Sequence, residues 1–231
     1  MYSGRGIFFM RIGFLTNGKL ADFSGGKLHP AELYCLAFGS IGEVNYEKEV
    51  HGETAEMEEV ALFSRAACSV VVAGCCTDTK GIKRRSAIVA DKGKILGISD
   101  MTAGLDGENY SSGAGVRIYD TSAGKLGVLV GRDVYFSELS ASLARCGGDL
   151  IVSIYEHVGK NVEQVLLRAD AFRYGVTMCM CAHGFAQVAD SSGELAFASP
   201  MSPTWCNIKE VKEYHLVQTR RRGFFKPQEM Y

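Results

Sequence analysis

Residues 125–155, KLGVLVGRDVYFSELSASLARCGGDLIVSIY, have the pattern of a strand, a sharp turn, a helix and a second strand. Residues 126–130 form a short apolar run with β-branched side chains, which predicts a buried strand. Gly131 begins the turn, Ser137 is a good N-cap for the helix, and Glu138 suits its first turn. Ligands and catalytic groups of α/β proteins gather in the loop after a strand's carboxyl end. We therefore expect the functional site at Gly131.

The length and charge of the chain restrict what it can be. Its 231 residues are enough for one large domain with a sizeable core, and we expect residues 1–231 to form that single domain. A net charge of −1 gives no electrostatic reason to expect nucleic acid or a membrane surface as a partner. No apolar run reaches the ~18 residues of a transmembrane helix.

The start of the chain and its cysteines indicate where the protein works. The first residues lack the small-residue cleavage site of a signal peptide and read as a leader into a strand, with Met1 and Met10 both open as the native start. The eight cysteines include no paired C-x-x-C motif, so we expect reduced and mostly buried thiols, no metal site and no cofactor. These features predict a cytoplasmic protein.

The pattern of apolar residues predicts further elements outside the central stretch. Strands are expected over residues 7–15, 33–38, 69–74, 86–90, 94–98, 115–120, 175–181, 185–189 and 194–198. Helices are expected over residues 54–67 and 162–173, and a loop over residues 17–30. Lys92 and Gly93 are expected to form a hairpin turn.

The central stretch resembles the nucleophile elbow of the nitrilase superfamily of carbon–nitrogen hydrolases. That motif reads approximately G-x-x-x-C-x-D-x-x-F-P-E, followed by a helix and G-A-D-L. The matching residues are Gly127, Asp133, Phe136, Glu138, Gly148, Asp149 and Leu150. The position of the family's cysteine nucleophile falls on Gly131, and Ser137 replaces the proline.

The resemblance extends over almost the whole chain. A family hairpin is matched by Ser86, Ala87, Asp91, Gly93 and Gly97, and residues 211–222 and 226–231 resemble the family's C-terminal arm. Counting on from the hairpin places the family's catalytic lysine position at Met101. The position of its catalytic glutamate falls on Phe38, and Glu43 lies further on in a loop.

This resemblance implies an α+β fold, a four-layer α-β-β-α sandwich that assembles as a homodimer. In the family a cysteine is the nucleophile, a glutamate the general base, and a lysine the cation that stabilises the intermediate. Phe38, Met101 and Gly131 can play none of these roles. We therefore predict a catalytically inactive homologue, a pseudoenzyme, that binds a small molecule or has a role in assembly.

An active amide or nitrile hydrolase with relocated catalytic residues is the alternative. Cys75 and Cys76 follow one predicted strand, and His183 follows Cys181 after another. A Cys–His pair at these strand ends would make a new nucleophile.

The side chains now at the family's catalytic positions predict the size and polarity of the pocket. Phe38 and Met101 are bulky and apolar, so we expect them to pack against each other or against Gly131 and to leave a small, mostly apolar site. The residues expected around it are Arg132, Asp133, Tyr135, Glu138 and Asp106. Asp133 and Glu138 are expected to hold the elbow and the helix, with Arg132 turned toward Asp133, Glu138 or Asp106.

Overall fold

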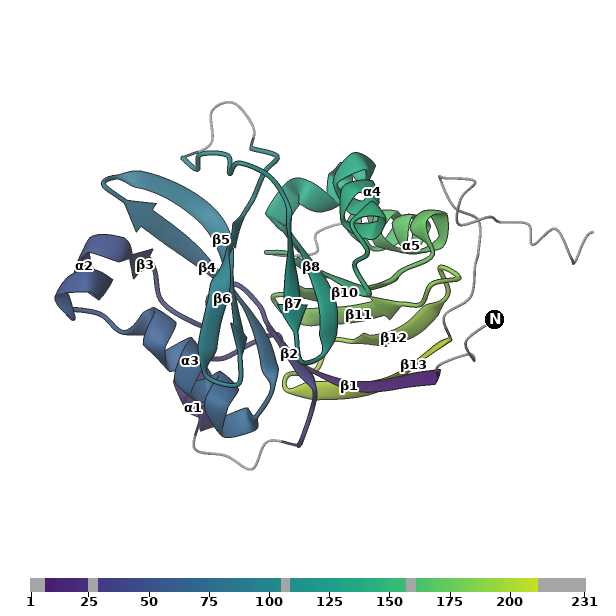
Figure 1. Ribbon diagram of the computed structural model, residues 1–231, viewed down its shortest axis with the longest axis horizontal. Coiled ribbons are helices and arrows are strands. Elements are labelled where there is room, and N and C mark those ends of the chain that lie inside the picture. Colours follow the sequence, from purple (N-terminus) through teal and green to yellow (C-terminus); the bar gives the residue numbers. More distant parts are fainter. Residues whose placement is uncertain (1–6, 25–28, 105–108, 157–160, 212–231) are drawn as a thin grey trace, which may run out of the picture.

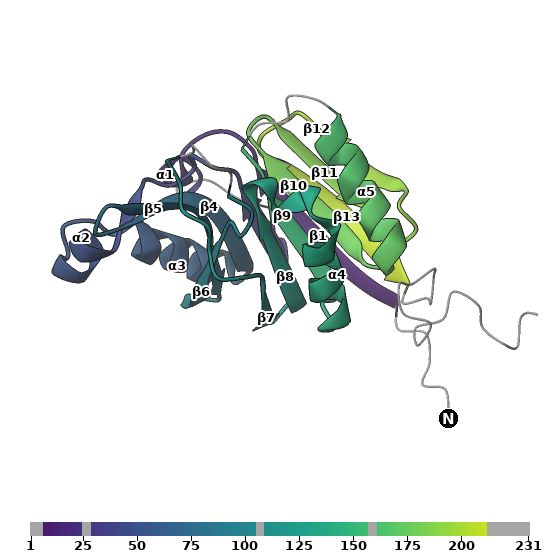
Figure 2. The same ribbon diagram turned by 90° about the horizontal axis from the view of Figure 1, so that it is seen from above.

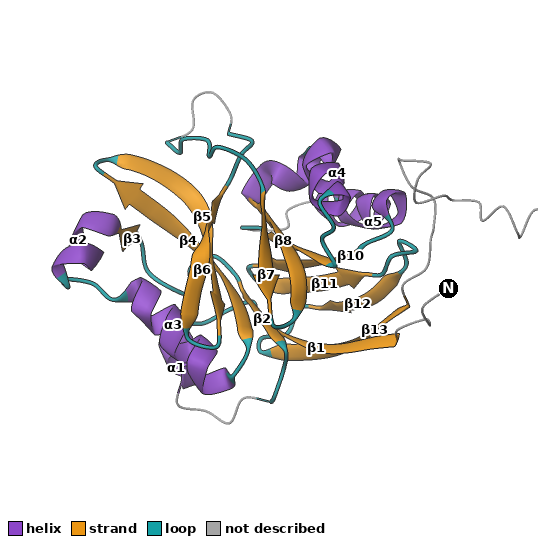
Figure 3. Ribbon diagram, in the orientation of Figure 1, coloured by secondary structure: helices purple, strands orange, loops and turns teal. Residues whose placement is uncertain are grey.

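The strands form two sheets in the computed structural model, which describes residues 7–24, 29–104, 109–156 and 161–211. The first sheet contains β1 (Ile7–Leu15), β2 (Leu33–Leu36), β3 (Val44–Asn45), β4 (Val70–Thr79), β5 (Ile82–Asp91), β6 (Lys94–Asp100) and β13 (Thr204–Val211). The second contains β7 (Arg117–Thr121), β8 (Gly124–Val130), β9 (Leu150–Ile154), β10 (Thr177–Ala182), β11 (Phe185–Ala189) and β12 (Leu195–Ser199). Figure 3 distinguishes these strands from the helices.

The three longest helices lie on the outer faces of the two sheets, while α2 lies beyond one end of the first sheet (Figures 1 and 2). The helices are α1 (Leu20–Ser24), α2 (Tyr46–His51), α3 (Glu56–Ala67), the 3-10 helix η1 (Gly131–Tyr135), α4 (Ser137–Arg145) and α5 (Val162–Tyr174). Helix α3 packs on the first sheet, while α4 and α5 lie side by side on the second. The predicted α-β-β-α sandwich is confirmed. Within the described residues, no helix is long and apolar enough to cross a membrane.

Strand order brings several strand ends to one edge of the sandwich. The order is β13-β1-β2-β4-β5-β6 in the first sheet, with β3 beside β4, and β12-β11-β10-β9-β8-β7 in the second. Strands β2 and β4 are parallel, as are β8, β9 and β10. The carboxyl ends of β2, β8, β9 and β10 lie at this edge, whereas β4 continues past Ala73, the partner of Leu36, to Thr79. We call this edge the rim and define it by four residues within two positions of the ends of β2, β8, β9 and β10: Phe38, Gly131, Tyr155 and His183.

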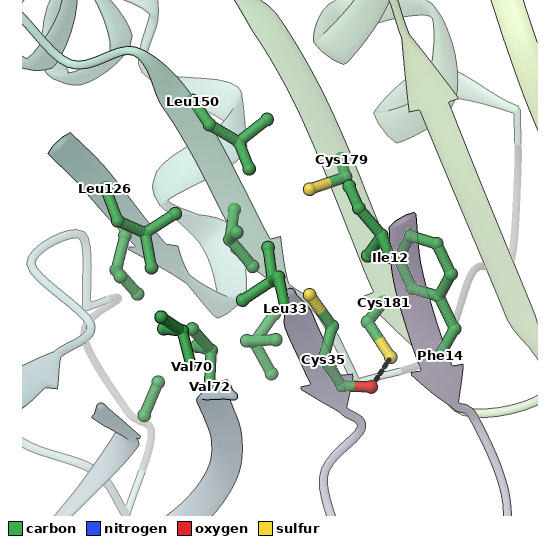
Figure 4. Close-up of a cluster of buried hydrophobic side chains, with 14 of the residues drawn as sticks. Ile12, Phe14, Leu33, Cys35, Val70, Val72, Leu126, Leu150, Cys179 and Cys181 are labelled. Carbon is green, nitrogen blue, oxygen red and sulfur yellow. Dashed lines mark hydrogen bonds between the residues drawn. The ribbon is translucent and has the colours of Figure 1, made fainter. Parts of the chain in front are cut away.

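The main core lies between the sheets (Figure 4). Inward-facing side chains alternate along each strand, as with Val70 and Val72 on β4. Cys181 belongs to this core, and its Sγ donates to the carbonyl oxygen of Cys35, 3.3 Å away. The expectation of mostly buried thiols is confirmed, with the buried cysteines being Cys35, Cys75, Cys179, Cys181 and Cys206.

Several predicted boundaries are wrong. Residues 17–30 include the short helix α1, and the strand predicted over residues 33–38 ends at Leu36. Ser137 is the first residue of α4 and not its N-cap; Phe136 holds the N-cap position without a side-chain cap bond. The short helix α2 and the strand β13 were not predicted, although β13 pairs with β1 along its whole length. The predicted C-terminal arm lies outside the described residues beyond Val211.

Candidate functional site

Gly131 stands directly after β8, at the position where the sequence places the site. Its φ of +54° is in the left-handed region, which favours glycine. A Cβ atom on Gly131 would lie 2.7 Å from Sδ of Met101 and 3.9 Å from Cδ of Arg85. Met101 is fully buried. Its side chain therefore fills the space in front of Gly131, and the predicted packing of Met101 against Gly131 is confirmed.

The carboxylate of Asp133 holds Met101 in this place. One carboxylate oxygen of Asp133 accepts hydrogen bonds from the backbone N–H groups of Thr102 and Ala103, both at 2.9 Å. The other accepts from the N–H of Val130 at 3.2 Å. Burial raises the pKa of the Asp133 carboxyl, and these three N–H donors oppose the rise. Asp133 thus holds the elbow, as expected, and ties it to the segment after β6.

An ion pair joins the two sheets beside Met101. Nε of Arg85, on β5, lies 2.9 Å from a carboxylate oxygen of Glu156, two residues beyond β9. The guanidinium carbon lies 4.6 Å from the ring centre of Tyr110, a cation–π distance. The Tyr110 hydroxyl in turn is 3.7 Å from Sγ of Cys76, the residue opposite Arg85 in the β4–β5 ladder.

This charged group was missed by the sequence analysis. The signal is the alternation of side chains along β5: Ala87 and Val89 face the core between the sheets, so Arg85 points inward as well. In the sequence it stands in the run Lys83-Arg84-Arg85, which reads as a solvent-exposed charged segment.

The predicted site residues divide into those near Gly131 and those further away. Phe38 packs partly buried against the core, but the three atoms nearest to a Cβ on Gly131 belong to Met101 and Arg85. Glu138 is exposed in the first turn of α4. Asp106 lies outside the described residues. The acid toward which Arg132 turns stays a prediction.

Tyr135 belongs to a separate hydrogen-bonded group behind the turn. Its hydroxyl donates to a carboxylate oxygen of the buried Glu163 at 2.5 Å, and the hydroxyl of Tyr155 donates to the same oxygen at 3.2 Å. Burial raises the pKa of Tyr135, and the positive charge of Arg132 opposes that rise. Tyr135 therefore links η1 to the start of α5.

The proposed replacement nucleophiles differ in their surroundings. Cys75 packs in the cluster between the first sheet and α3, and Cys181 lies in the core between the sheets. Burial raises the pKa of both thiols far above the usual range, which opposes thiolate formation. Cys76 is partly exposed near the rim. His183 is exposed, and its backbone N–H donates to the carbonyl oxygen of Glu156 at 2.9 Å.

Glu43 forms an ion pair of its own. One of its carboxylate oxygens lies 2.8 Å from Nζ of Lys83, which stands two residues from Arg85 along β5. Somewhat less than half of each side chain is exposed. Neither Glu43 nor Lys83 supplies one of the three atoms nearest to a Cβ on Gly131.

Comparison with solved structures identifies the fold. The carbon-nitrogen hydrolase from Helicobacter pylori G27 superposes with a TM-score of 0.73 at 16% identity, covering 93% of this chain and 90% of that chain. Nit3 of Saccharomyces cerevisiae, a member of branch 10 of the nitrilase superfamily, gives 0.73 at 14% identity, covering 88% and 90%. An amidase from Nesterenkonia sp. gives 0.70 at 19% identity, covering 89% and 91%. The chain therefore has the fold of the nitrilase superfamily.

Sequence comparison adds nothing to this similarity of structure. No protein-family model matches the chain, and no curated protein matches its sequence.

The contact between Gly131 and Met101 can be tested by combining two substitutions. We predict that Gly131→Ala lowers the free energy of unfolding by about 2–4 kcal/mol, because the new Cβ meets the Met101 sulfur and the left-handed backbone disfavours a side chain. Met101→Ala removes the clash, so urea unfolding of the double variant should show less destabilisation than the sum of the single variants.

Gly52→Ala is the matched control. Gly52 also has a positive φ, +70°, but a Cβ there would have no atom within 4 Å. Gly52→Ala should lower the free energy of unfolding only through the left-handed backbone, by about 1–2 kcal/mol. Its effect should add to that of Met101→Ala without coupling. Simple additivity for Gly131→Ala and Met101→Ala would show that the two residues do not touch.

Proposed function

We propose that this chain, whose fold is that of the nitrilase superfamily, is a homologue that does not hydrolyse carbon–nitrogen bonds and that binds a small molecule at the rim. One observation carries the proposal. The side chain of Met101 occupies the space in front of Gly131, the residue that the sequence resemblance assigns to the family's nucleophile position.

The chemistry of the family explains why this observation matters. In a variant of the Nesterenkonia amidase, the acetamide moiety of fluoroacetamide is covalently added at the active-site cysteine. Such an intermediate needs a sulfur atom at the elbow, a base to deprotonate it and a cation for the developing negative charge. Gly131 provides no sulfur atom. Loss of one member of such a unit typically removes about 10⁴-fold or more of the rate.

Hydrolysis with relocated residues is the second candidate, and Cys76 is the observation that favours it. Its partly exposed thiol lies near the rim, opposite Arg85 in the ladder and 3.7 Å from the Tyr110 hydroxyl. A thiol, the Arg85 cation and the Glu156 carboxylate are the three kinds of group that amide hydrolysis uses. Against it, Arg85 and Glu156 are engaged with each other.

Ammonia release distinguishes the two candidates. We predict that the purified protein releases no ammonia from a panel of amides, nitriles and carbamoyl compounds above a protein-free control. Gly131→Cys should be equally inactive, because the Phe38 and Met101 positions still lack the base and the cation. A turnover that Cys76→Ala abolishes and that Cys68→Ala, at an exposed cysteine outside the rim, leaves intact would establish the second candidate instead.

We also propose that the protein is a cytoplasmic homodimer that pairs through α5. Exposed apolar side chains on this helix support the proposal, and they are Val162, Val165 and Phe172. Val165→Glu should shift the molar mass measured by light scattering from dimer to monomer. Leu62→Glu, at a similarly exposed position on α3 (50% against 59% for Val165), is the control that should leave the mass unchanged. A monomeric wild-type protein would contradict the proposal.

A further inference from the structure

We propose that Arg85 is the anion-binding residue of this rim and that it takes up a small aliphatic monocarboxylate in exchange for Glu156. The inference rests on the proposed function, because it names the chemical class of the molecule bound at the same site. It is carried by the geometry of Arg85, by its unused N–H donors and by the exposure of Glu156.

Arg85 is held rigidly at the centre of the site. Its side chain is only 15% exposed, its Cδ would lie 3.9 Å from a Cβ on Gly131, and its guanidinium lies over the ring of Tyr110. Its backbone carbonyl accepts the N–H of Met101 at 2.8 Å. A guanidinium fixed by a ring and by its own strand loses little freedom when it binds an anion.

The ion pair with Glu156 engages only some of the N–H donors of the Arg85 guanidinium. The atom closest to the Glu156 carboxylate is Nε, and neither terminal guanidinium nitrogen has a hydrogen-bond partner among the described residues. A guanidinium presents five N–H donors in a fork that matches the two oxygens of a carboxylate. A free carboxylate can therefore make two parallel hydrogen bonds where Glu156 makes a single close approach.

The Glu156 carboxylate can move away from Arg85 without its own negative charge becoming buried. Its side chain is 43% exposed, so its carboxylate reaches water when it rotates away from Arg85. Its backbone stays in place, since the carbonyl oxygen accepts the N–H of His183. The Glu156 carboxylate thus marks the volume that a ligand carboxylate would occupy, and no further cavity is required for the charged group.

The side chains around Arg85 determine which group attached to the ligand carboxylate fits the site. Met101 is apolar, and Cys76, the cross-strand partner of Arg85, carries a weakly polar thiol. These side chains suit a short alkyl group better than a second charge. Propionate is therefore a fitting probe, and propionamide is its neutral counterpart of nearly the same shape.

Calorimetric titration with sodium propionate tests the proposal. The wild-type protein should bind propionate and not propionamide. Glu156→Gln should bind propionate about fivefold more tightly, because the competing carboxylate is gone. Arg85→Gln should lose binding, and Arg85→Lys, which keeps the charge without the fork, should bind more weakly than wild type. Arg84→Gln is the matched control. Nε of Arg84 lies 3.8 Å from a carboxylate oxygen of Asp100, and this substitution should leave the affinity for propionate unchanged.

The outcomes separate this inference from the proposed function. Equal propionate binding by wild type and Arg85→Gln would overturn it, and so would a folded Glu156→Gln protein that binds no propionate. If Arg85→Gln unfolds, as judged by circular dichroism, the Glu156→Gln and Arg85→Lys titrations decide. Ammonia release from propionamide would instead refute the absence of hydrolysis, whether or not Arg85 binds propionate.

Discussion

The carboxylate of Asp133 is the constraint on which the rest of the site depends. It binds the backbone of Thr102 and Ala103 with one oxygen and that of Val130 with the other, and so joins the end of β8 to the segment after β6. Because each buried N–H needs an acceptor, the segment cannot move away at low cost. Met101 precedes Thr102 directly, so this junction places the methionine sulfur in front of Gly131.

This junction leaves a site with charge but without a nucleophile at the elbow. The Met101 side chain fills the space in front of Gly131, where a nucleophile was expected, while Arg85 and Glu156 connect the two sheets at the rim. Arg85 is the more buried partner, so removal of the Glu156 carboxylate leaves its charge uncompensated unless another anion takes that place. This composition is the basis for proposing that the site recognises an anion and does not attack an amide.

Much of the fold could be predicted from the sequence, because alternating apolar runs and the turn at Gly131 are local signals. The short helix α2 gave no such signal, and β13 is recognisable only through its pairing with β1. The site was harder to predict. The hydrogen bonds of Asp133 span about thirty residues, and Arg85 becomes a core residue only once the register of β4 and β5 is known. The contacts of Asp133 leave no pattern in the sequence near them, and the alternation that turns Arg85 inward is hidden by the charged run Lys83-Arg84-Arg85.

The most direct test of the filled site is a nuclear Overhauser measurement on protein with isotope-labelled methionine side chains. We predict cross-peaks between the side-chain protons of Met101 and the α-protons of Gly131, because the Met101 sulfur lies 2.7 Å from the Cβ position of Gly131. Absence of these cross-peaks, together with cross-peaks from Gly131 to water, would contradict the filled site and show an open cleft at the elbow.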